Sequence, residues 1–417
     1  MEEIKDYVLS IGKNAKEAFK VFSKATTSQK NKALSFIAKY ILENQDYIIN
    51  ENKKDIEYTR SKGDPESLVD RVVLNEKRIR GIVDSINTII LLDDPVGKVV
   101  YSSRRPNGLL VNKVRVPIGV ILMIYEARPN VTVDAASLII KSGNVGVLRG
   151  GTKAYYSNVA LSSLISRALK EADLPEFAIQ YISRTEHEVI DELLKLDEYI
   201  DVVIPRGAEG LIRSVVEKAK MPVLRQERGV CHVYVEKSAD KDMAERITVN
   251  SKAQRPSVCN AAETLLIHKD YPYKKELLEA LVKANVRLKG CEETKKILPS
   301  VELAREEDYY TEYLDYIMNV KIVGSTDEAI EHIKKYGSGH TEAIVTRDYF
   351  EANKFLKELD SSTIMVNAST RFTDGGEFGL GAEIGISTHR FHARGPMGLL
   401  ELTADKWIVY GEGQIRE

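Results

Sequence analysis

Residues 119–151 read GVILMIYEARPNVTVDAASLIIKSGNVGVLRGG. Two short apolar runs, 119–125 and 145–149, have the length and composition of buried strands. The segment between them, 133–141, carries its apolar residues at helical spacing. Strand–helix–strand units of this length form parallel sheets, because the crossover helix returns the chain to the same end of the sheet. Such units recur with strands at 179–182, 202–204 and 223–225. They recur again from 232 to 359, with strands at 232–235, 263–268, 320–323 and 342–345. The alternation predicts two doubly wound α/β domains.

Other patterns lie outside this alternation. Residues 2–60 and 75–92 carry apolar side chains at helical spacing, so we expect helices there. Residues 99–117 change character and predict a β-hairpin about the turn Arg105-Pro106-Asn107-Gly108. The expected organisation is one domain of residues 1–98 with 118–230, a second of 231–398, and two outlying segments, 99–117 and 399–417.

The composition is that of a soluble globular protein, with 43% hydrophobic and 29% charged residues. A net charge of −2 gives no general attraction to nucleic acid or to a membrane surface. The longest apolar runs are too short to span a bilayer, and the N-terminus lacks the apolar core of a signal peptide. Three widely spaced cysteines form neither a disulfide framework nor a metal site. We therefore expect a cytoplasmic protein with no metal.

One cysteine has an unusual setting. Residues 250–268 read NSKAQRPSVCNAAETLLIH, which places Cys259 between a polar, basic turn and a strand-like run. Lys252 and Arg255 would lower the pKa of this thiol and raise the fraction of nucleophilic thiolate. An arbitrary cysteine is more often a small residue of the core. Neighbours such as Gln254 and Ser257 are not typical of a core, so the pattern favours a nucleophile.

Two glycine-containing loops follow predicted strands. They are RGG at 149–151 and RGAEG at 206–210. Both lie at the carboxyl ends of strands, where open α/β sheets bind ligands. Glycines let the backbone approach a phosphate, and a helix that begins near Ala208 would offer free N–H groups. Such loops are also ordinary turns. The candidate cofactor-binding residues are Arg149, Gly150, Gly207 and Glu209.

Four long segments resemble one family and occur in the order expected for it. They are AQRPSVCNAAETLLIH at 253–268, the stretch 125–151, GVCHVYVEKSAD at 229–240, and the loop 367–398. By these motifs the chain is similar to the gamma-glutamyl phosphate reductases (glutamate-5-semialdehyde dehydrogenases), a branch of the aldehyde dehydrogenase superfamily. The resemblance implies an aldehyde dehydrogenase-like fold. It also implies NADPH-dependent reduction of L-glutamyl 5-phosphate to L-glutamate 5-semialdehyde, with phosphate release through a cysteine thioacyl intermediate, in proline biosynthesis.

The resemblance also implies roles for single residues. Cys259 is the nucleophile, and Asn130 matches the superfamily's donor to the oxyanion, although an asparagine after Pro129 is also a common turn residue. Arg149 matches a basic residue near the adenosine ribose or its 2′-phosphate, which implies NADP(H), with NAD as the alternative. Glu312 matches a contact to the nicotinamide ribose, or else is a solvated acidic turn.

The family's hydrolytic relatives carry a general-base glutamate ahead of a glycine pair. Here that position is held by Gln226 or by Glu227, since the alignment is ambiguous by one residue. Loss of the base would favour exchange with phosphate over hydrolysis. A hydrolytic NAD-dependent semialdehyde dehydrogenase remains the alternative activity, and a catalytically silent binding protein is the alternative without catalysis.

The loop 369–398 is rich in charge and glycine, and long loops of this kind commonly carry function. An acyl phosphate of glutamate bears a phosphate, an α-carboxylate and an α-ammonium. Arginine suits the anions through paired hydrogen bonds, and a carboxylate suits the ammonium. His389 and His392 lack a third ligand at a spacing that fits a metal. The candidate substrate-binding residues are Arg255, Arg371, Glu383 and Arg394.

The two outlying segments predict self-association. A protruding hairpin leaves open strand edges and is not stable alone. Superfamily members lay such a hairpin, together with a C-terminal strand, against a second subunit. We therefore expect a homo-oligomer, at least a dimer, and a transient contact with the glutamate 5-kinase that makes the labile substrate.

Overall fold

The computed structural model describes residues 2–225 and 228–416. Its contacts divide the chain into two compact units. The first, unit 1, comprises Met1–Arg225, Gly379–Gly385 and Met397–Glu417; the second, unit 2, comprises Gln226–Phe378 and Ile386–Pro396. The domains expected from the sequence are functional domains, whereas these two units are defined by contacts within the chain. The expected domain limits therefore stay a prediction.

Unit 1 contains a parallel four-stranded sheet of β3 (Val120–Tyr125), β4 (Val145–Gly150), β5 (Ile179–Tyr181) and β6 (Val202–Arg206). These predicted strands are confirmed, and every residue of β3 and β4 is buried, as their apolar composition requires. The spatial order β5-β4-β3-β6 reverses direction between β3 and β6. One predicted strand, 223–225, is wrong: only Val223 forms an isolated bridge, to Val203, because so short a run supplies no further pairing.

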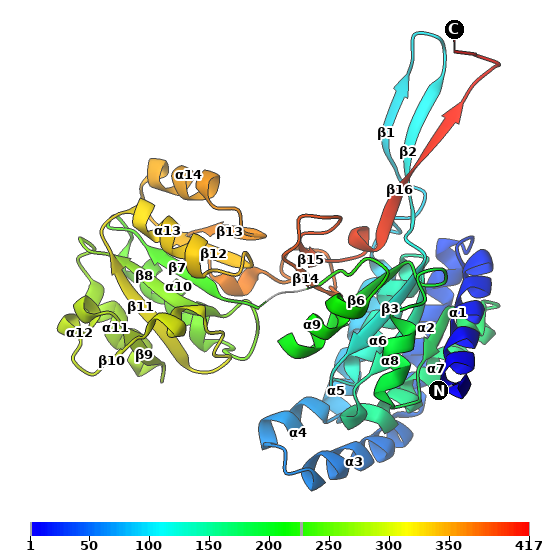
Figure 1. Ribbon diagram of the computed structural model, residues 1–417, viewed down its shortest axis with the longest axis horizontal. Coiled ribbons are helices and arrows are strands. Elements are labelled where there is room, and N and C mark those ends of the chain that lie inside the picture. Colours follow the sequence, from blue (N-terminus) through cyan, green and yellow to red (C-terminus); the bar gives the residue numbers. More distant parts are fainter. Residues whose placement is uncertain (1, 226–227, 417) are drawn as a thin grey trace. The chain divides into compact units, whose positions relative to one another are not determined.

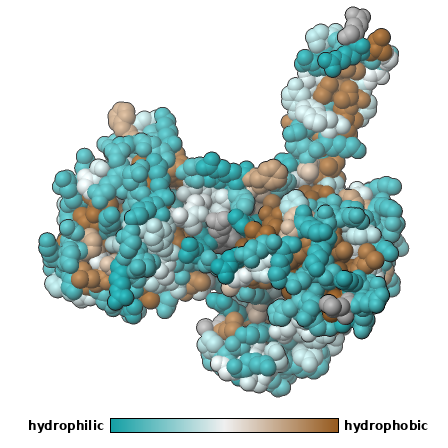
Figure 2. Space-filling view, viewed as in Figure 1, coloured by the Kyte–Doolittle hydropathy of each residue, from teal (hydrophilic) through white to brown (hydrophobic). Residues whose placement is uncertain are grey.

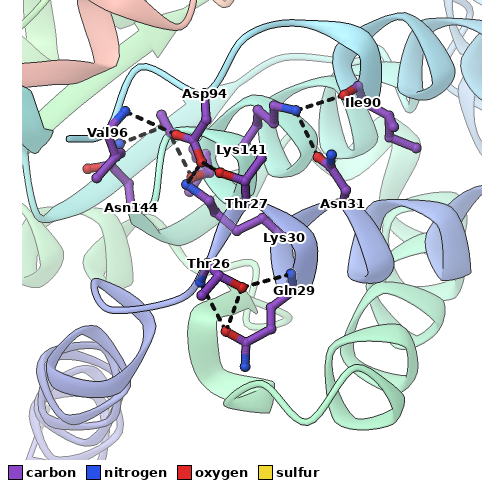
Figure 3. Close-up of polar contacts among 12 residues, drawn as sticks. Thr26, Thr27, Gln29, Lys30, Asn31, Ile90, Asp94, Val96, Lys141 and Asn144 are labelled. Atoms are coloured by element: carbon purple, nitrogen blue, oxygen red, sulfur yellow. Dashed lines mark hydrogen bonds and ion pairs between the residues drawn. The ribbon is translucent and has the colours of Figure 1, made fainter. Parts of the chain in front are cut away.

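Nine helices are described in unit 1, and they include those predicted in 2–60 and 75–92. Helix α2 begins after a reciprocal cap in which the Thr26 N–H donates to Gln29 Oε1 at 3.0 Å and the Gln29 N–H donates to Thr26 Oγ1 at 3.3 Å (Figure 3). The helices are α1 (Glu2–Phe22), α2 (Thr27–Glu43), α3 (Gln45–Ser61), α4 (Glu66–Val72), α5 (Glu76–Leu91), α6 (Asn130–Lys141), α7 (Tyr155–Glu171), α8 (His187–Leu193) and α9 (Glu209–Lys218).

A three-stranded antiparallel sheet forms an arm of unit 1 (Figure 1). The predicted hairpin is confirmed as β1 (Val99–Arg104) and β2 (Leu110–Pro117). Along its whole length, the C-terminal strand β16 (Thr403–Tyr410) pairs with β2, with Trp407 opposite Lys113. We call β1, β2 and β16 the arm.

Unit 2 is built on a parallel seven-stranded sheet in the order β10-β9-β11-β8-β7-β12-β13. The predicted strands near 232–235, 263–268, 320–323 and 342–345 are confirmed. Three further strands, β9, β10 and β13, each of four residues or fewer, were not predicted. The strands are β7 (Cys231–Val235), β8 (Ala262–His268), β9 (Arg287–Gly290), β10 (Glu302–Leu303), β11 (Ile317–Val323), β12 (Thr341–Val345) and β13 (Thr363–Val366).

Helices α10 (Lys241–Ala253), α11 (Lys274–Lys283), α12 (Glu292–Ile297), α13 (Thr326–Tyr336) and α14 (Tyr349–Glu358) accompany this sheet. Apolar residues from α10, α11 and the strands form one large buried cluster. A second cluster joins α13 and α14 to β7, β8 and β12. Two short strands, β14 (Gly385–Ser387) and β15 (Gly395–Met397), pair with each other. The aldehyde dehydrogenase-like α/β class expected from the sequence is thus confirmed.

A buried ion pair joins α2 to the loop after α5 in unit 1 (Figure 3). Lys30 Nζ lies 2.5 Å from Asp94 Oδ2, and the two side chains are 1% and 10% exposed. Asp94 also accepts from Thr27 Oγ1 at 2.7 Å and from the Val96 N–H at 3.0 Å. Nearby, the buried Lys141 donates to Asn31 and to the carbonyl of Ile90. A single carboxylate therefore compensates Lys30 and lies close to a second buried ammonium.

We expect Asp94→Ala to destabilise unit 1 by about 3–5 kcal/mol, because breaking a buried pair leaves an uncompensated charge in the core. Denaturant titration would measure the loss. Asp93→Ala is the matched control: Asp93 pairs with Lys98 at the surface, with its side chain 89% exposed, and should change stability little. Equal stabilities of the two variants would contradict the prediction.

Candidate active site

Cys259 lies in unit 2, on the turn that connects α10 to β8. Its side chain is partly exposed, whereas Cys231 is buried. Cys291 precedes α12 and contacts Thr294 at 3.2 Å, in another part of the unit. Of the three cysteines, Cys259 is therefore the one on a polar turn, as the sequence predicted.

The segment before β7 supports the main chain of Cys259. A Cβ atom on Gly229 would lie 1.9 Å from the Cys259 carbonyl oxygen, so only glycine fits there. The Cys231 thiol donates to the same carbonyl, with Sγ and O 3.2 Å apart. Burial raises the pKa of Cys231 well above its usual value, so this thiol stays protonated and keeps its donor. Cys231 thus positions the turn.

Polar side chains from the loop after β13 reach this turn. Arg371 Nε donates to Gln254 Oε1 at 2.8 Å, and its guanidinium also donates to Asn260 Oδ1. The Asn260 amide donates to the carbonyl of Thr373 at 2.8 Å. Burial, and then the adjacent Arg255, lowers the pKa of Arg371, while nearby Cys259 opposes the shift. The structure therefore brings Arg255 and Arg371 close to the candidate nucleophile.

Lys252 differs from its expected place. It was expected beside the thiol, but its side chain is fully buried and lies 2.7 Å from Glu263 Oε2. Burial raises the pKa of Glu263 to about 7, although Lys252 opposes the shift. Helix α10 continues to Ala253, and Lys252 lies on its buried face. The buried pairing of Glu263 with Lys252 was not predicted, because Glu263 lies inside an apolar, strand-like run.

The other two predicted substrate residues are Arg394 and Glu383. The Arg394 guanidinium donates to Asp360 Oδ1 at 2.7 Å, on the surface of unit 2. Glu383 belongs to the short segment Gly379–Gly385 of unit 1. Their roles in substrate binding stay predictions.

Unit 1 carries the predicted cofactor loops at the carboxyl ends of its strands. The loop after β6 leads into α9, and residues 207–210 are exposed. No side-chain hydrogen bond caps this helix at Ala208, and the N-terminus of a helix favours an anion. The loop follows the strand at which the sheet order reverses, where open α/β sheets bind nucleotides. Gly207 and Glu209 therefore fit a phosphate-binding site.

Arg149 and Gly150 end β4 and are buried. A Cβ atom on Gly150 would lie 2.2 Å from the Asn158 amide nitrogen, so packing requires the glycine. Arg149 is 6% exposed, and it donates to the carbonyls of Gly150 and of Thr185. Burial lowers its pKa. Arg149 thus shapes the strand end, and its contact with a cofactor phosphate stays a prediction.

Asn130 is the first residue of α6, and its side-chain amide donates to Asp134 Oδ2 at 2.9 Å. Glu312, in unit 2, accepts a hydrogen bond from the Gly229 N–H at 3.0 Å. It therefore lies beside the segment that supports Cys259. Gln226 and Glu227, the candidate general-base positions, fall outside the described residues.

Among residues 2–225 and 228–416, no three side chains of histidine, cysteine, aspartate or glutamate are grouped so that they could hold a metal. The same residues include no helix with the length and apolar character needed to cross a bilayer.

Known proteins identify the class to which this fold and site belong. Residues 4–305 match the model of the aldehyde dehydrogenase family. Gamma-glutamyl phosphate reductase of Carboxydothermus hydrogenoformans is 52% identical over 413 residues, which cover 99% of this chain and 100% of that protein. The reductase of Dictyoglomus thermophilum is 54% identical and covers 97% and 98% of the two chains.

Solved structures agree. The crystal structure of gamma-glutamyl phosphate reductase from Thermotoga maritima has a TM-score of 0.96 and 50% identity, and the match covers 98% of this chain and all 100% of that one. An acetylating aldehyde dehydrogenase from Geobacillus thermoglucosidasius, with a TM-score of 0.71 and 18% identity over 100% and 98% of the chains, shares the fold alone. The chain belongs to the aldehyde dehydrogenase family, in its gamma-glutamyl phosphate reductase branch. It is an oxidoreductase, and this family uses a nicotinamide cofactor.

Proposed function

We propose that the protein reduces L-glutamyl 5-phosphate to L-glutamate 5-semialdehyde with NADPH, through a thioester on Cys259, in the cytoplasm. The observation that carries this proposal is the placement of Cys259 on a polar turn, with its main chain held by Gly229 and Cys231 and with Arg371 beside it. Gly229 and Cys231 contact the main chain of Cys259, and its side chain is partly exposed. The Cys259 thiol is therefore the group that a substrate can reach.

The chemistry then follows from these side chains. The Cys259 thiolate attacks the acyl carbon, a C–S bond forms, and the C–O bond to phosphate breaks with its electron pair on the departing phosphate. Arg255 and Arg371 offer positive charge to that phosphate. Asn130 donates to the carbonyl oxygen as negative charge develops on it. After reduction, the thiohemiacetal releases the aldehyde, and Cys259 recovers its thiolate.

When bound, NADP(H) supplies the hydride. The uncapped N-terminus of α9 fits the pyrophosphate of such a dinucleotide. Gly207 and Glu209 stand at that position, and Glu312 offers a carboxylate for ribose hydroxyls.

Phosphate dependence tests the reaction. In the reverse direction, glutamate 5-semialdehyde should reduce NADP⁺ only when inorganic phosphate is present, because phosphate must release the acyl group from Cys259. The absorbance of NADPH reports the rate. Rapid NADP⁺ or NAD⁺ reduction without phosphate would instead identify the hydrolytic alternative.

The cofactor preference depends on Arg149 in this proposal. Arg149→Ala should weaken binding of NADPH much more than binding of NADH, since a guanidinium gains most from a dianionic phosphate. Fluorescence titration of both cofactors measures the two affinities. An equal loss for both would assign Arg149 to the strand end alone, in keeping with its bonds to Gly150 and Thr185.

Self-association is the remaining part of the proposal. Aromatic and aliphatic residues are exposed along the arm. Figure 2 shows hydrophobic residues in brown on the part of the arm in view. A sheet of three strands with an apolar surface is typical of a protein–protein interface. The exposed residues are Val99, Val100, Tyr101, Trp407, Val409 and Tyr410.

Light scattering should therefore give at least twice the monomer mass. Deletion of 406–417 should lower that mass or precipitate the protein, because it removes most of β16 and uncovers β2. Trp407→Glu should weaken association, whereas Leu91→Glu, at a residue 85% exposed on α5, is the matched control. A monomer at micromolar concentration would contradict the prediction. A transient contact with the kinase that supplies the acyl phosphate is part of the same proposal.

A further inference from the structure

The amide of Asn130 is held by a carboxylate on its own helix. Asn130 and Asp134 are one helical turn apart on α6, so their side chains lie on the same face. Side chains on a helix lean toward its N-terminus, which directs Asp134 back toward Asn130. The Asn130 Nδ2 atom donates to Asp134 Oδ2 at 2.9 Å.

This contact determines which way the amide faces. An asparagine side chain has a donor end, Nδ2, and an acceptor end, Oδ1, and a rotation of the amide exchanges them. A developing oxyanion is stabilised by the donor end and repelled by the acceptor end. An ionised carboxylate can only accept, so Asp134 bonds to Nδ2 and excludes the rotated form. Nδ2 keeps a second hydrogen for a substrate oxygen.

The carboxylate is itself held in place from a neighbouring helix. Ser85, on α5, lies with its hydroxyl 3.4 Å from Asp134 Oδ1. Among the described residues Asp134 forms no salt bridge, and burial raises its pKa. Burying a carboxylate without a cation costs free energy of folding. This cost argues that Asp134 has a role beyond packing.

We propose that Asp134 is a positioning residue, which fixes the Asn130 amide with its donor end available to the substrate carbonyl oxygen. The inference rests on the proposed function, since it gives Asn130 the role of oxyanion donor. Asp134 does not touch the substrate in this account. It acts through Asn130 and should therefore affect the rate of the chemical step more than substrate affinity.

The test replaces Asp134 by residues that differ in what they can accept and donate. In Asp134→Asn the new amide either accepts from Nδ2 or donates to Oδ1, so both orientations of Asn130 are allowed. We expect kcat to fall about tenfold, the factor for one hydrogen bond of ordinary net strength, with KM little changed. Asp134→Glu still only accepts and should keep more of the activity. Asp84→Asn, on the exposed face of α5, is the matched control and should behave as the unchanged protein.

A double-mutant cycle separates positioning from a general structural effect. In an Asn130→Ala background, Asp134→Asn should lower kcat no further, because the amide that it positions is gone. Equal losses in the Asn and Glu variants, or a full loss that persists without Asn130, would overturn the inference and leave the proposed function intact. Normal activity of Asn130→Ala would instead overturn the oxyanion role and the inference with it.

Discussion

Replacement of Cys259 by alanine is expected to abolish turnover while NADPH binding and the unfolding temperature stay close to those of the unchanged protein. The reason is chemical: without the thiolate no thioester forms, and no other thiol lies on the polar turn. The rate of NADP⁺ reduction in the presence of phosphate and semialdehyde measures the loss. Mass spectrometry of the protein mixed with acyl phosphate should show a covalent adduct only when Cys259 is present.

The two other cysteines serve as matched controls. Cys291→Ala removes contacts with Thr294 and with the Ile322 N–H of β11, and it should be fully active. Cys231→Ala removes a donor to the Cys259 carbonyl, so it should remain active but be less stable. Appreciable turnover by Cys259→Ala would refute the assignment of the nucleophile.

Asn130→Ala is expected to lower kcat by about a hundred- to a thousandfold, the usual effect of removing one oxyanion donor. Substrate affinity should change far less, because the bond strengthens only as charge develops on the carbonyl oxygen. Steady-state kinetics in both directions separate kcat from KM. A change confined to KM would make Asn130 a turn residue at the start of α6.

The two sheets were predictable because their strands are apolar runs separated by helices of ordinary length. The hairpin was predictable for a different reason: its turn carries proline, asparagine and glycine in a row. Strands β9 and β13 were not predicted, although the still shorter β5 was, because β9 and β13 depend on neighbouring strands to hold them as strands. Pairing with β11 and β12, respectively, supplies that context.

The site was harder to predict from the sequence than the fold. The motif around Cys259 identified the nucleophile, but its charge pattern did not show that Lys252 is buried against Glu263. Arg149 was likewise predicted to contact a cofactor phosphate, and the sequence did not show that its guanidinium donates hydrogen bonds to the carbonyls of Gly150 and Thr185. The turn of Cys259 also precedes β8, so the rule that ligands bind at carboxyl ends of strands would not have found it. For Lys252 and Arg149 the missing information is the direction of a side chain, which depends on tertiary packing.

The pairing of β16 with β2 has a consequence for how the chain is made. During synthesis the hairpin emerges early, yet its partner strand β16 follows much later in the chain. All seven strands of the unit 2 sheet are complete before then. Until β16 arrives, β2 presents an unpaired edge that the corresponding strand of another nascent copy could occupy. Exchange of this strand between chains on neighbouring ribosomes is then the expected misfolding route of this protein, and faster synthesis of the segment from β2 to β16 should suppress it.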